Sequence, residues 1–160
     1  TPKPSSAASD VYKRQNNNMM NSLIEACIKF SVSLNIACPK SYQPNKMLIS
    51  LIKKQKGKIK IFNKKEIAVK NSDVVMTDKI ISLNDKVNKK KKLKSFKNFK
   101  LDAKTMNLAK KDAIFLHCLP RGNEVTEEVF LGKQSKVWQQ ALNRVYVQKS
   151  ILLYCFGKLR

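Results

Sequence analysis

Residues 113–120 read AIFLHCLP, an apolar run that passes into polar residues and then meets a proline. The four apolar residues at its start predict a short strand that is buried on both faces, as strands of parallel sheets are. Pro120 favours an extended backbone just before it, so the thiol of Cys118 is expected at the exit of this strand rather than in a helix. We therefore take His117 and Cys118 as candidates for a site at the end of a strand.

Outward from this run, strand and helix patterns alternate along the chain. Short apolar runs predict strands, and apolar residues at three- and four-residue spacing predict helices. The predicted strands are residues 34–38, 59–62, 74–76 and 113–116. The predicted helices are residues 19–30, 44–57, 64–70, 103–110 and 138–156. This alternation predicts a doubly wound, Rossmann-like α/β fold with a mostly parallel sheet and helices on both faces.

The first 15 residues differ from the rest of the chain. They are rich in Ser, Ala and Pro and show neither helical nor strand periodicity. We interpret residues 1–15 as a non-native or unstructured leader and predict a single domain over residues 16–160.

The chain is strongly basic, because its 160 residues hold 33 Lys and Arg against 11 Asp and Glu, a net charge of +22. Such a balance is typical of proteins that bind nucleic acid or anionic membranes. Only four of these 33 residues are Arg, which nucleic-acid sites favour for bidentate contacts, and the Lys residues are scattered. The densest run, residues 89–94, has no aromatic side chains that could stack on bases. We interpret the charge as a solvated surface and keep a basic nucleic-acid-binding module as the alternative.

The cysteines and the single histidine indicate no metal centre. Cys27, Cys38, Cys118 and Cys155 form no closely spaced pair, and His117 leaves no second imidazole for a zinc site. Cysteines spaced in this way are typical of reduced thiols in the cytoplasm. The longest apolar runs are too short for a membrane-spanning helix. We therefore expect a cytoplasmic protein without a metal site or a membrane span.

Three polar groups lie where a doubly wound sheet binds ligands, beyond the carboxyl ends of its strands. Asn17 and Asn18 begin the first helix, where free N–H groups suit a carboxylate or phosphate, unless one Asn merely caps the helix. Asp78 follows a strand and suits an ammonium group, or else ends the strand in an Asx-turn. Cys118 is a hydrogen-bond partner or a thiolate; a Cys–His nucleophile pair is disfavoured, because neighbours along a strand point to opposite faces.

Several motifs resemble those of the ornithine carbamoyltransferases. They are NNMMNSL at residues 17–23, ACPKSY at 37–42, DVVMTD at 73–78, HCLPR at 117–121, EVTEEVF at 124–130 and QALNRVYVQK at 140–149. The related aspartate enzymes typically carry Pro where Cys118 stands, which favours the ornithine branch. The resemblance extends over residues 16–160 and implies the ornithine-binding domain of such an enzyme.

This resemblance implies a reaction in which the side-chain amine of ornithine attacks carbamoyl phosphate, giving citrulline and phosphate in arginine biosynthesis. No metal or organic cofactor is implied. On the ornithine side, Asn18 is expected to hold the carboxylate of ornithine and Asp78 its α-ammonium. Ser82 and Leu83 are expected to belong to a mobile loop that closes over ornithine.

On the carbamoyl-phosphate side, the resemblance assigns three residues. Cys118 is expected to lie against the attacking amine and the carbamoyl oxygen, and Leu119 to contribute a backbone carbonyl. Arg144 is expected to donate to the carbamoyl oxygen, where charge develops in the transition state. Cys118, Asp78 and Arg144 are thus the expected catalytic residues.

The resemblance also implies an N-terminal carbamoyl-phosphate domain with Ser-Thr-Arg-Thr and His-Pro motifs, neither of which occurs in this sequence. The 160-residue chain is therefore expected to be inactive. The family's ornithine domain also has a central first strand where residues 1–15 stand, so the sheet is expected to lack its first strand and the chain to be prone to aggregation through the exposed strand edges. The whole gene product is expected to be a homotrimer. The family's substrate loop reads Ser-Met-Gly, whereas this chain has Ser82, Leu83 and Asn84. Putrescine or acetylornithine therefore stays open as the amine substrate.

Overall fold

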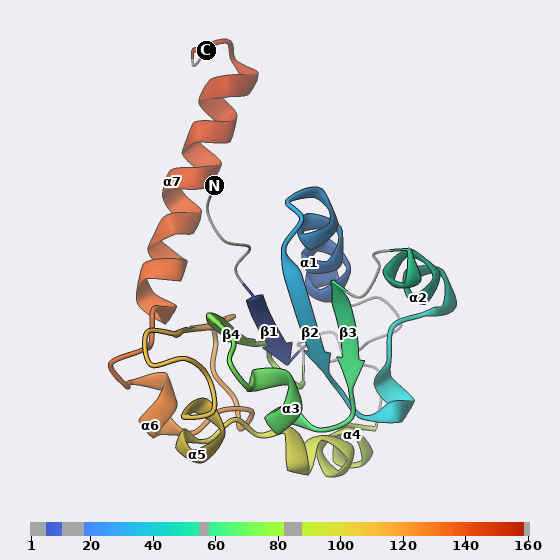
Figure 1. Cartoon of the computed structure of the whole chain (residues 1–160). Helices are drawn as coiled ribbons and strands as arrows, with labels where there is room; N and C mark the ends of the chain where they lie inside the picture. Colours follow the sequence, from blue (N-terminus) through green and yellow to red (C-terminus); the bar gives the residue numbers. More distant parts are fainter. Residues whose placement is uncertain (1–5, 11–17, 55–57, 82–87, 159–160) are drawn as a thin grey trace.

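The computed structural model describes residues 6–10, 18–54, 58–81 and 88–158. Within them, five strands form one sheet in which every neighbouring pair is parallel. The strands are β1 (Ser6–Asp10), β2 (Ser33–Ala37), β3 (Ile59–Phe62), β4 (Val74–Thr77) and β5 (Ile114–His117). Their order across the sheet is β3-β2-β1-β4-β5, so the predicted doubly wound parallel sheet is confirmed (Figure 1).

Helices connect the strands on both faces of the sheet. They are α1 (Asn18–Lys29), α2 (Lys46–Lys53), α3 (Lys65–Val69), α4 (Lys89–Phe96), α5 (Ala103–Met106), α6 (Glu127–Phe130) and α7 (Val137–Cys155), with 3-10 turns η1 (Lys40–Tyr42) and η2 (Lys97–Phe99). Every predicted helix and strand is present. The helix predicted for residues 103–110 is shorter than expected, and α4 and α6 were not predicted.

The central strand β1 corrects the interpretation of the first 15 residues. The backbone of Ser6–Asp10 pairs with β2 on one side and with β4 on the other. The predictions that this segment is unstructured and that the sheet lacks its first strand are therefore wrong. Strand pairing uses backbone N–H and C=O groups, which every residue here supplies, and β2 and β4 would otherwise each present an unpaired edge.

Alternate residues of β2 face two different layers. Leu34 and Ile36 pack with α1 and α2 in one apolar cluster, whereas Ala37 packs with Ala68 of α3 and Phe96 of α4 in another. This period of two is what a strand buried on both faces produces. The sheet is therefore covered by helices on both sides.

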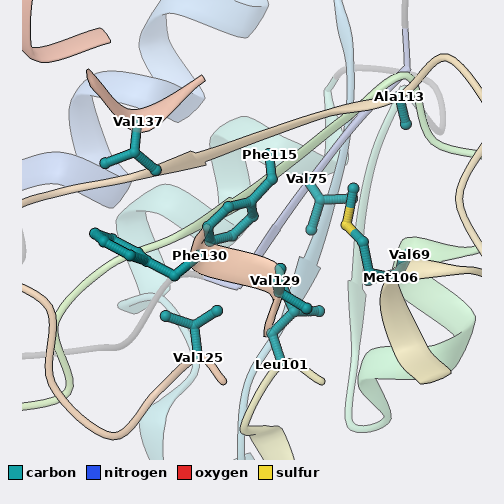
Figure 2. Packing of buried hydrophobic residues seen from close by; sticks show 10 residues of the cluster. All are labelled: Val69, Val75, Leu101, Met106, Ala113, Phe115, Val125, Val129, Phe130 and Val137. Atoms are coloured by element: carbon teal, nitrogen blue, oxygen red, sulfur yellow. The ribbon is translucent and has the colours of Figure 1, made fainter. Parts of the chain in front are cut away.

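A third cluster joins β4 and β5 to α5, α6 and the start of α7. Figure 2 shows Phe115 of β5 among Phe130, Val129 and Met106, with Val137 above it. Because Thr77 and His117 lie two residues after Val75 and Phe115, they face the same layer. This layer therefore encloses the side chains that precede Asp78 and Cys118.

The Lys-rich run forms helix α4 rather than a loop. Asn88 caps this helix, since its Oδ1 accepts the Lys91 N–H at 3.2 Å. Lys92 is only 3% exposed and lies one turn before the buried Phe96. The interpretation of the whole run as a solvated surface is thus wrong for Lys92, whose long aliphatic stem lies on the covered face of the helix.

Helix α7 projects away from the sheet (Figure 1). Val137 at its first turn is buried against β5, but every residue from 141 to 155 is exposed. The exposed side chains include Leu142, Tyr146 and Leu152. Since they point in several directions around the helix, α7 has no single apolar face turned toward the rest of this chain.

Candidate functional site

The site lies at the carboxyl edge of β1, β4 and β5. In the ladder, Asp10 of β1 pairs with Thr77 of β4, and Thr77 pairs with His117 of β5, so three strands end at the same level. From β1 the chain continues to β2 and β3 on one side of the sheet, whereas β4 and β5 lie on the other. In doubly wound sheets ligands bind at such a switch point.

Asp78 and Cys118 meet at this edge. They are the first residues after β4 and β5, and the Cys118 N–H donates to the Thr77 carbonyl at 3.4 Å. Burial, the negative charge of Asp78 and a hydrogen bond with its carboxylate raise the pKa of the Cys118 thiol from 9.0 to about 12. Cys118 is therefore a protonated thiol at neutral pH, suited to hydrogen bonding rather than to nucleophilic attack.

The Asp78 carboxylate is half-buried at the end of β4. Its Oδ1 accepts the N–H of Lys79 at 2.7 Å, so the local turn uses one oxygen of the group. A carboxylate has about four lone-pair sites. The turn and ligand interpretations are therefore compatible, because the remaining sites suit an ammonium group.

The side chain of His117 points into the protein and does not pair with Cys118. Its Nδ1 lies 2.8 Å from the Thr77 hydroxyl and 3.0 Å from the Thr77 carbonyl oxygen, and its Nε2 lies 3.1 Å from Oε1 of Glu124. The ring stacks on Phe115 and meets Phe130 edge-on. His117 is therefore held by Thr77 at Nδ1 and by the two aromatic rings, with the Glu124 carboxylate close to Nε2 but not in hydrogen-bond geometry, and it does not act as a base for Cys118.

Glu124 is a buried carboxylate with defined partners. Burial raises its pKa, but contacts with His117 and the backbone N–H groups of Gly122 and Glu124 itself outweigh that effect and lower it below its usual range. The Gly122 N–H donates to Oε1 at 2.5 Å. Glu124 is therefore ionised at neutral pH although it is only 1% exposed.

Arg144 lies on the exposed part of α7, so its position relative to Asp78 and Cys118 depends on how this helix docks. Gln140 accepts the backbone N–H of His117 through its Oε1 at 2.9 Å, which ties α7 to the end of β5. Arg144 is four residues further along and therefore lies on the same face of α7 as Gln140. Its side chain is exposed, and none of the described contacts joins it to Asp78 or Cys118.

The remaining predicted residues are only partly described. Asn18 is the first residue of α1, as expected for a residue at a helix start, but its side chain lies outside the description. Ser82 and Leu83 lie outside the described residues. Leu119 is exposed and precedes Pro120 through a cis peptide bond.

Three residues that support the site were not singled out from the sequence: Thr77 as a partner of His117, and Glu124 and Gln140. Glu124 begins the motif at residues 124–130, but its burial had no local signal, because a charged residue in a loop is ordinarily solvated. Gln140 stands in a recognised motif, but its contact with β5 depends on how α7 docks.

Within the described residues, no three His, Cys, Asp or Glu side chains gather as metal ligands. The described helices include none that is long and apolar enough to cross a membrane. A carboxylate and a protonated thiol thus lie at the switch point of a doubly wound sheet, the place where α/β domains of this class bind small polar molecules.

Comparison with known proteins gives the family. Residues 11–155 match the family model of the Asp/Orn-binding domain of aspartate/ornithine carbamoyltransferases, and this chain belongs to that family. It is 43% identical over 153 residues to an ornithine carbamoyltransferase of Methanococcus maripaludis, covering 91% of this chain and 50% of the relative. An ornithine carbamoyltransferase of Nitratiruptor is 40% identical over 149 residues, which are 89% of this chain and 48% of that protein.

Solved structures agree. The anabolic ornithine carbamoyltransferase of Campylobacter jejuni superposes with a TM-score of 0.83 at 35% identity, over 97% of this chain and 52% of that one. The ornithine carbamoyltransferase of Pyrococcus furiosus superposes with a TM-score of 0.82 at 30% identity, over 99% of this chain and 51% of that one. The predicted family resemblance is confirmed, and the chain spans about half the length of these relatives.

Proposed function

We propose that the whole protein of which this chain forms a part is an ornithine carbamoyltransferase. The side-chain amine of ornithine attacks the carbonyl carbon of carbamoyl phosphate and forms a new C–N bond. The tetrahedral intermediate then breaks its C–O bond to phosphate, and the amine nitrogen loses a proton. The products are citrulline and phosphate, in arginine biosynthesis. The observation that carries this proposal is the meeting of Asp78 and Cys118 at the switch point of a chain from this family.

The ornithine head group needs one partner for its ammonium and one for its carboxylate. The free lone pairs of Asp78 suit the α-ammonium. The start of α1 at Asn18 carries the positive end of a helix dipole, which suits the α-carboxylate. Ser82 and Leu83 are proposed to close over the bound amino acid.

Cys118 and Arg144 face the reacting groups in this proposal. A thiol with a pKa of about 12 stays protonated, so it can donate to or pack against the amine and carbamoyl groups without reacting with them. Leu119 adds its backbone carbonyl. Arg144 is proposed to stabilise the negative charge that develops on the carbamoyl oxygen, and the docking of α7 through Gln140 supports this role.

The rest of the protein completes the site. We propose that residues 16–160, joined by strand β1, form the ornithine-binding domain and that a carbamoyl-phosphate domain belongs to the half of the relatives that this chain does not span. The exposed apolar side chains of α7 are proposed to be covered in the whole protein. A cytoplasmic homotrimer without bound nucleic acid remains the proposed state.

The experiment is an assay of the whole gene product and of the 160-residue chain in parallel. Radiolabelled carbamoyl phosphate is supplied with ornithine, putrescine or acetylornithine, and the labelled product is separated. The proposal predicts citrulline from the whole protein with ornithine, and no turnover by the 160-residue chain. Preferential use of putrescine or acetylornithine would identify a different amine substrate, and absence of all three products would overturn the proposal.

A further inference from the structure

His117 is connected, through its side chain or its backbone, to every described element that carries an expected catalytic residue. Its Nδ1 lies within 3.0 Å of both Thr77 oxygens, and Thr77 immediately precedes Asp78. His117 itself immediately precedes Cys118. Its backbone N–H is accepted by Gln140, one helical turn before Arg144 on α7.

Glu124 closes this arrangement from the loop that follows β5. Its Oε1 lies 3.1 Å from Nε2 of His117 and accepts the Gly122 N–H, while its own carbonyl accepts the N–H of Leu101 at 2.8 Å. The side chains of His117 and Glu124 are 0% and 2% exposed, so neither can touch a ligand at the sheet edge. They act on the site through the backbone.

We propose that His117 and Glu124 form a positioning pair that sets the spacing of Asp78 and Cys118 in the ornithine site. The inference deepens the proposed function and rests on it. The ring fixes the end of β4 relative to the end of β5, and the carboxylate fixes the ring. A buried carboxylate with well-defined partners holds its geometry, because any movement leaves a charge without compensation.

A purely structural role for the pair makes a different prediction. If the pair only stabilises the domain, its loss lets the whole chain open more often, and every buried thiol becomes more reactive. If the pair positions the site, its loss separates Cys118 from Asp78 and changes the reactivity of Cys118 alone. Cys27 and Cys38 are buried in the layer beside α1 and report opening of the domain.

The test measures the alkylation rate of each cysteine with iodoacetamide at pH 8 to 10, by peptide mass spectrometry, in the whole protein. Glu124→Gln keeps the size of the side chain and removes its charge, and His117→Gln removes the ring. Asn45→Ala is the matched control, because it removes the cap of α2 at the opposite edge of the sheet. Unfolding by denaturant is followed for all variants.

We expect Cys118 to react at least tenfold faster in both positioning variants, with Cys27 and Cys38 unchanged, and no selective change in Asn45→Ala. An equal acceleration of all three thiols, or an unchanged Cys118 in a folded Glu124→Gln variant, overturns the inference. Calorimetric titration of the whole protein with ornithine separates the two claims. If the unsubstituted protein fails to bind ornithine while the thiol result holds, the ligand assignment fails and the positioning pair stands.

Discussion

Nε2 of His117 lies 3.1 Å from Oε1 of Glu124, and this contact is enclosed among Phe115, Phe130 and the ends of β4 and β5. A buried pair of this kind stabilises the fold only while both partners are present. Removing one partner leaves the other without compensation. The contact therefore has consequences for stability as well as for the site.

The first consequence concerns the stability of the fold at low pH. The pKa of Glu124 is lowered in the folded protein, so Glu124 binds its proton more readily in the unfolded chain than in the native one. Its contribution to stability is fully present above its ordinary pKa of 4.5 and is lost as the pH falls below that value. Denaturant unfolding at pH 3 to 7 is expected to show this loss, and Glu124→Gln is expected to flatten it. An identical pH dependence in both proteins contradicts the assignment.

Removing the Glu124 carboxylate altogether is expected to destabilise the fold further. Glu124→Ala is expected to lower the free energy of unfolding by about 3–5 kcal/mol, the range for loss of one partner from a buried pair. Urea unfolding followed by circular dichroism measures the change. Glu128→Ala, an exposed carboxylate on the neighbouring α6, is the control and is expected to change it by less than about 0.5 kcal/mol.

Gly122 is predicted to be required because it has no side chain. A Cβ at this position would lie 2.6 Å from Oε2 of Glu124, closer than carbon and oxygen can approach. Gly122→Ala therefore displaces the Glu124 carboxylate and is expected to cost about 1–3 kcal/mol of stability. Asn123→Ala, at the exposed neighbouring position, is the control; equal effects of the two substitutions would show that the close approach is unimportant.

Cys118 is predicted to be slow to alkylate at neutral pH. With a pKa of about 12 instead of 9.0, its thiolate fraction near pH 8 is roughly a thousandfold below that of an ordinary thiol. The alkylation rate should still be rising at pH 10 to 11. Asp78→Asn removes the negative charge beside the thiol and is expected to shift the profile to lower pH, whereas a plateau near pH 9 in the unsubstituted chain contradicts the contact.

Helix α7 is predicted to make the 160-residue chain self-associate. The sequence led us to expect aggregation from a missing strand, but β1 is present, and the exposed apolar surface of α7 now supplies the reason. Replacing Ile151 and Tyr154 by Lys is expected to reduce association in sedimentation velocity. Lys149→Glu leaves the apolar surface intact and is the control. A chain that stays monomeric at all concentrations contradicts the prediction.

The parallel sheet was predictable because its strands carry a strong local signal. Residues 113–116 are an apolar run, and residues 59–62 are apolar except for Lys60; both have the right length and fall within a residue of the observed strands. Strand β1 has no such signal, because its Ser and Ala residues have low strand propensity. It forms through the backbone pairing that β2 and β4 offer, which is a tertiary effect invisible to local patterns.

The candidate site was predictable in part for a related reason. Asp78 and Cys118 follow strands whose ends meet in any doubly wound sheet, so topology alone brings them together. The burial of Glu124 against His117 depends on how the loop after Pro120 folds back, which no local pattern encodes. For the same reason, the inward position of Lys92 on α4 could not be read from a run of similar residues.

The most direct measurement is the affinity of the whole protein for ornithine with and without the Asp78 carboxylate. Calorimetric titration should show binding by the unsubstituted protein and an affinity about a hundredfold weaker for Asp78→Asn, since loss of a partner from a charged pair costs about 2–5 kcal/mol. The unfolding midpoint should stay nearly constant, because Asp78 is only half-buried. Equal affinity of the two proteins for ornithine would contradict the account.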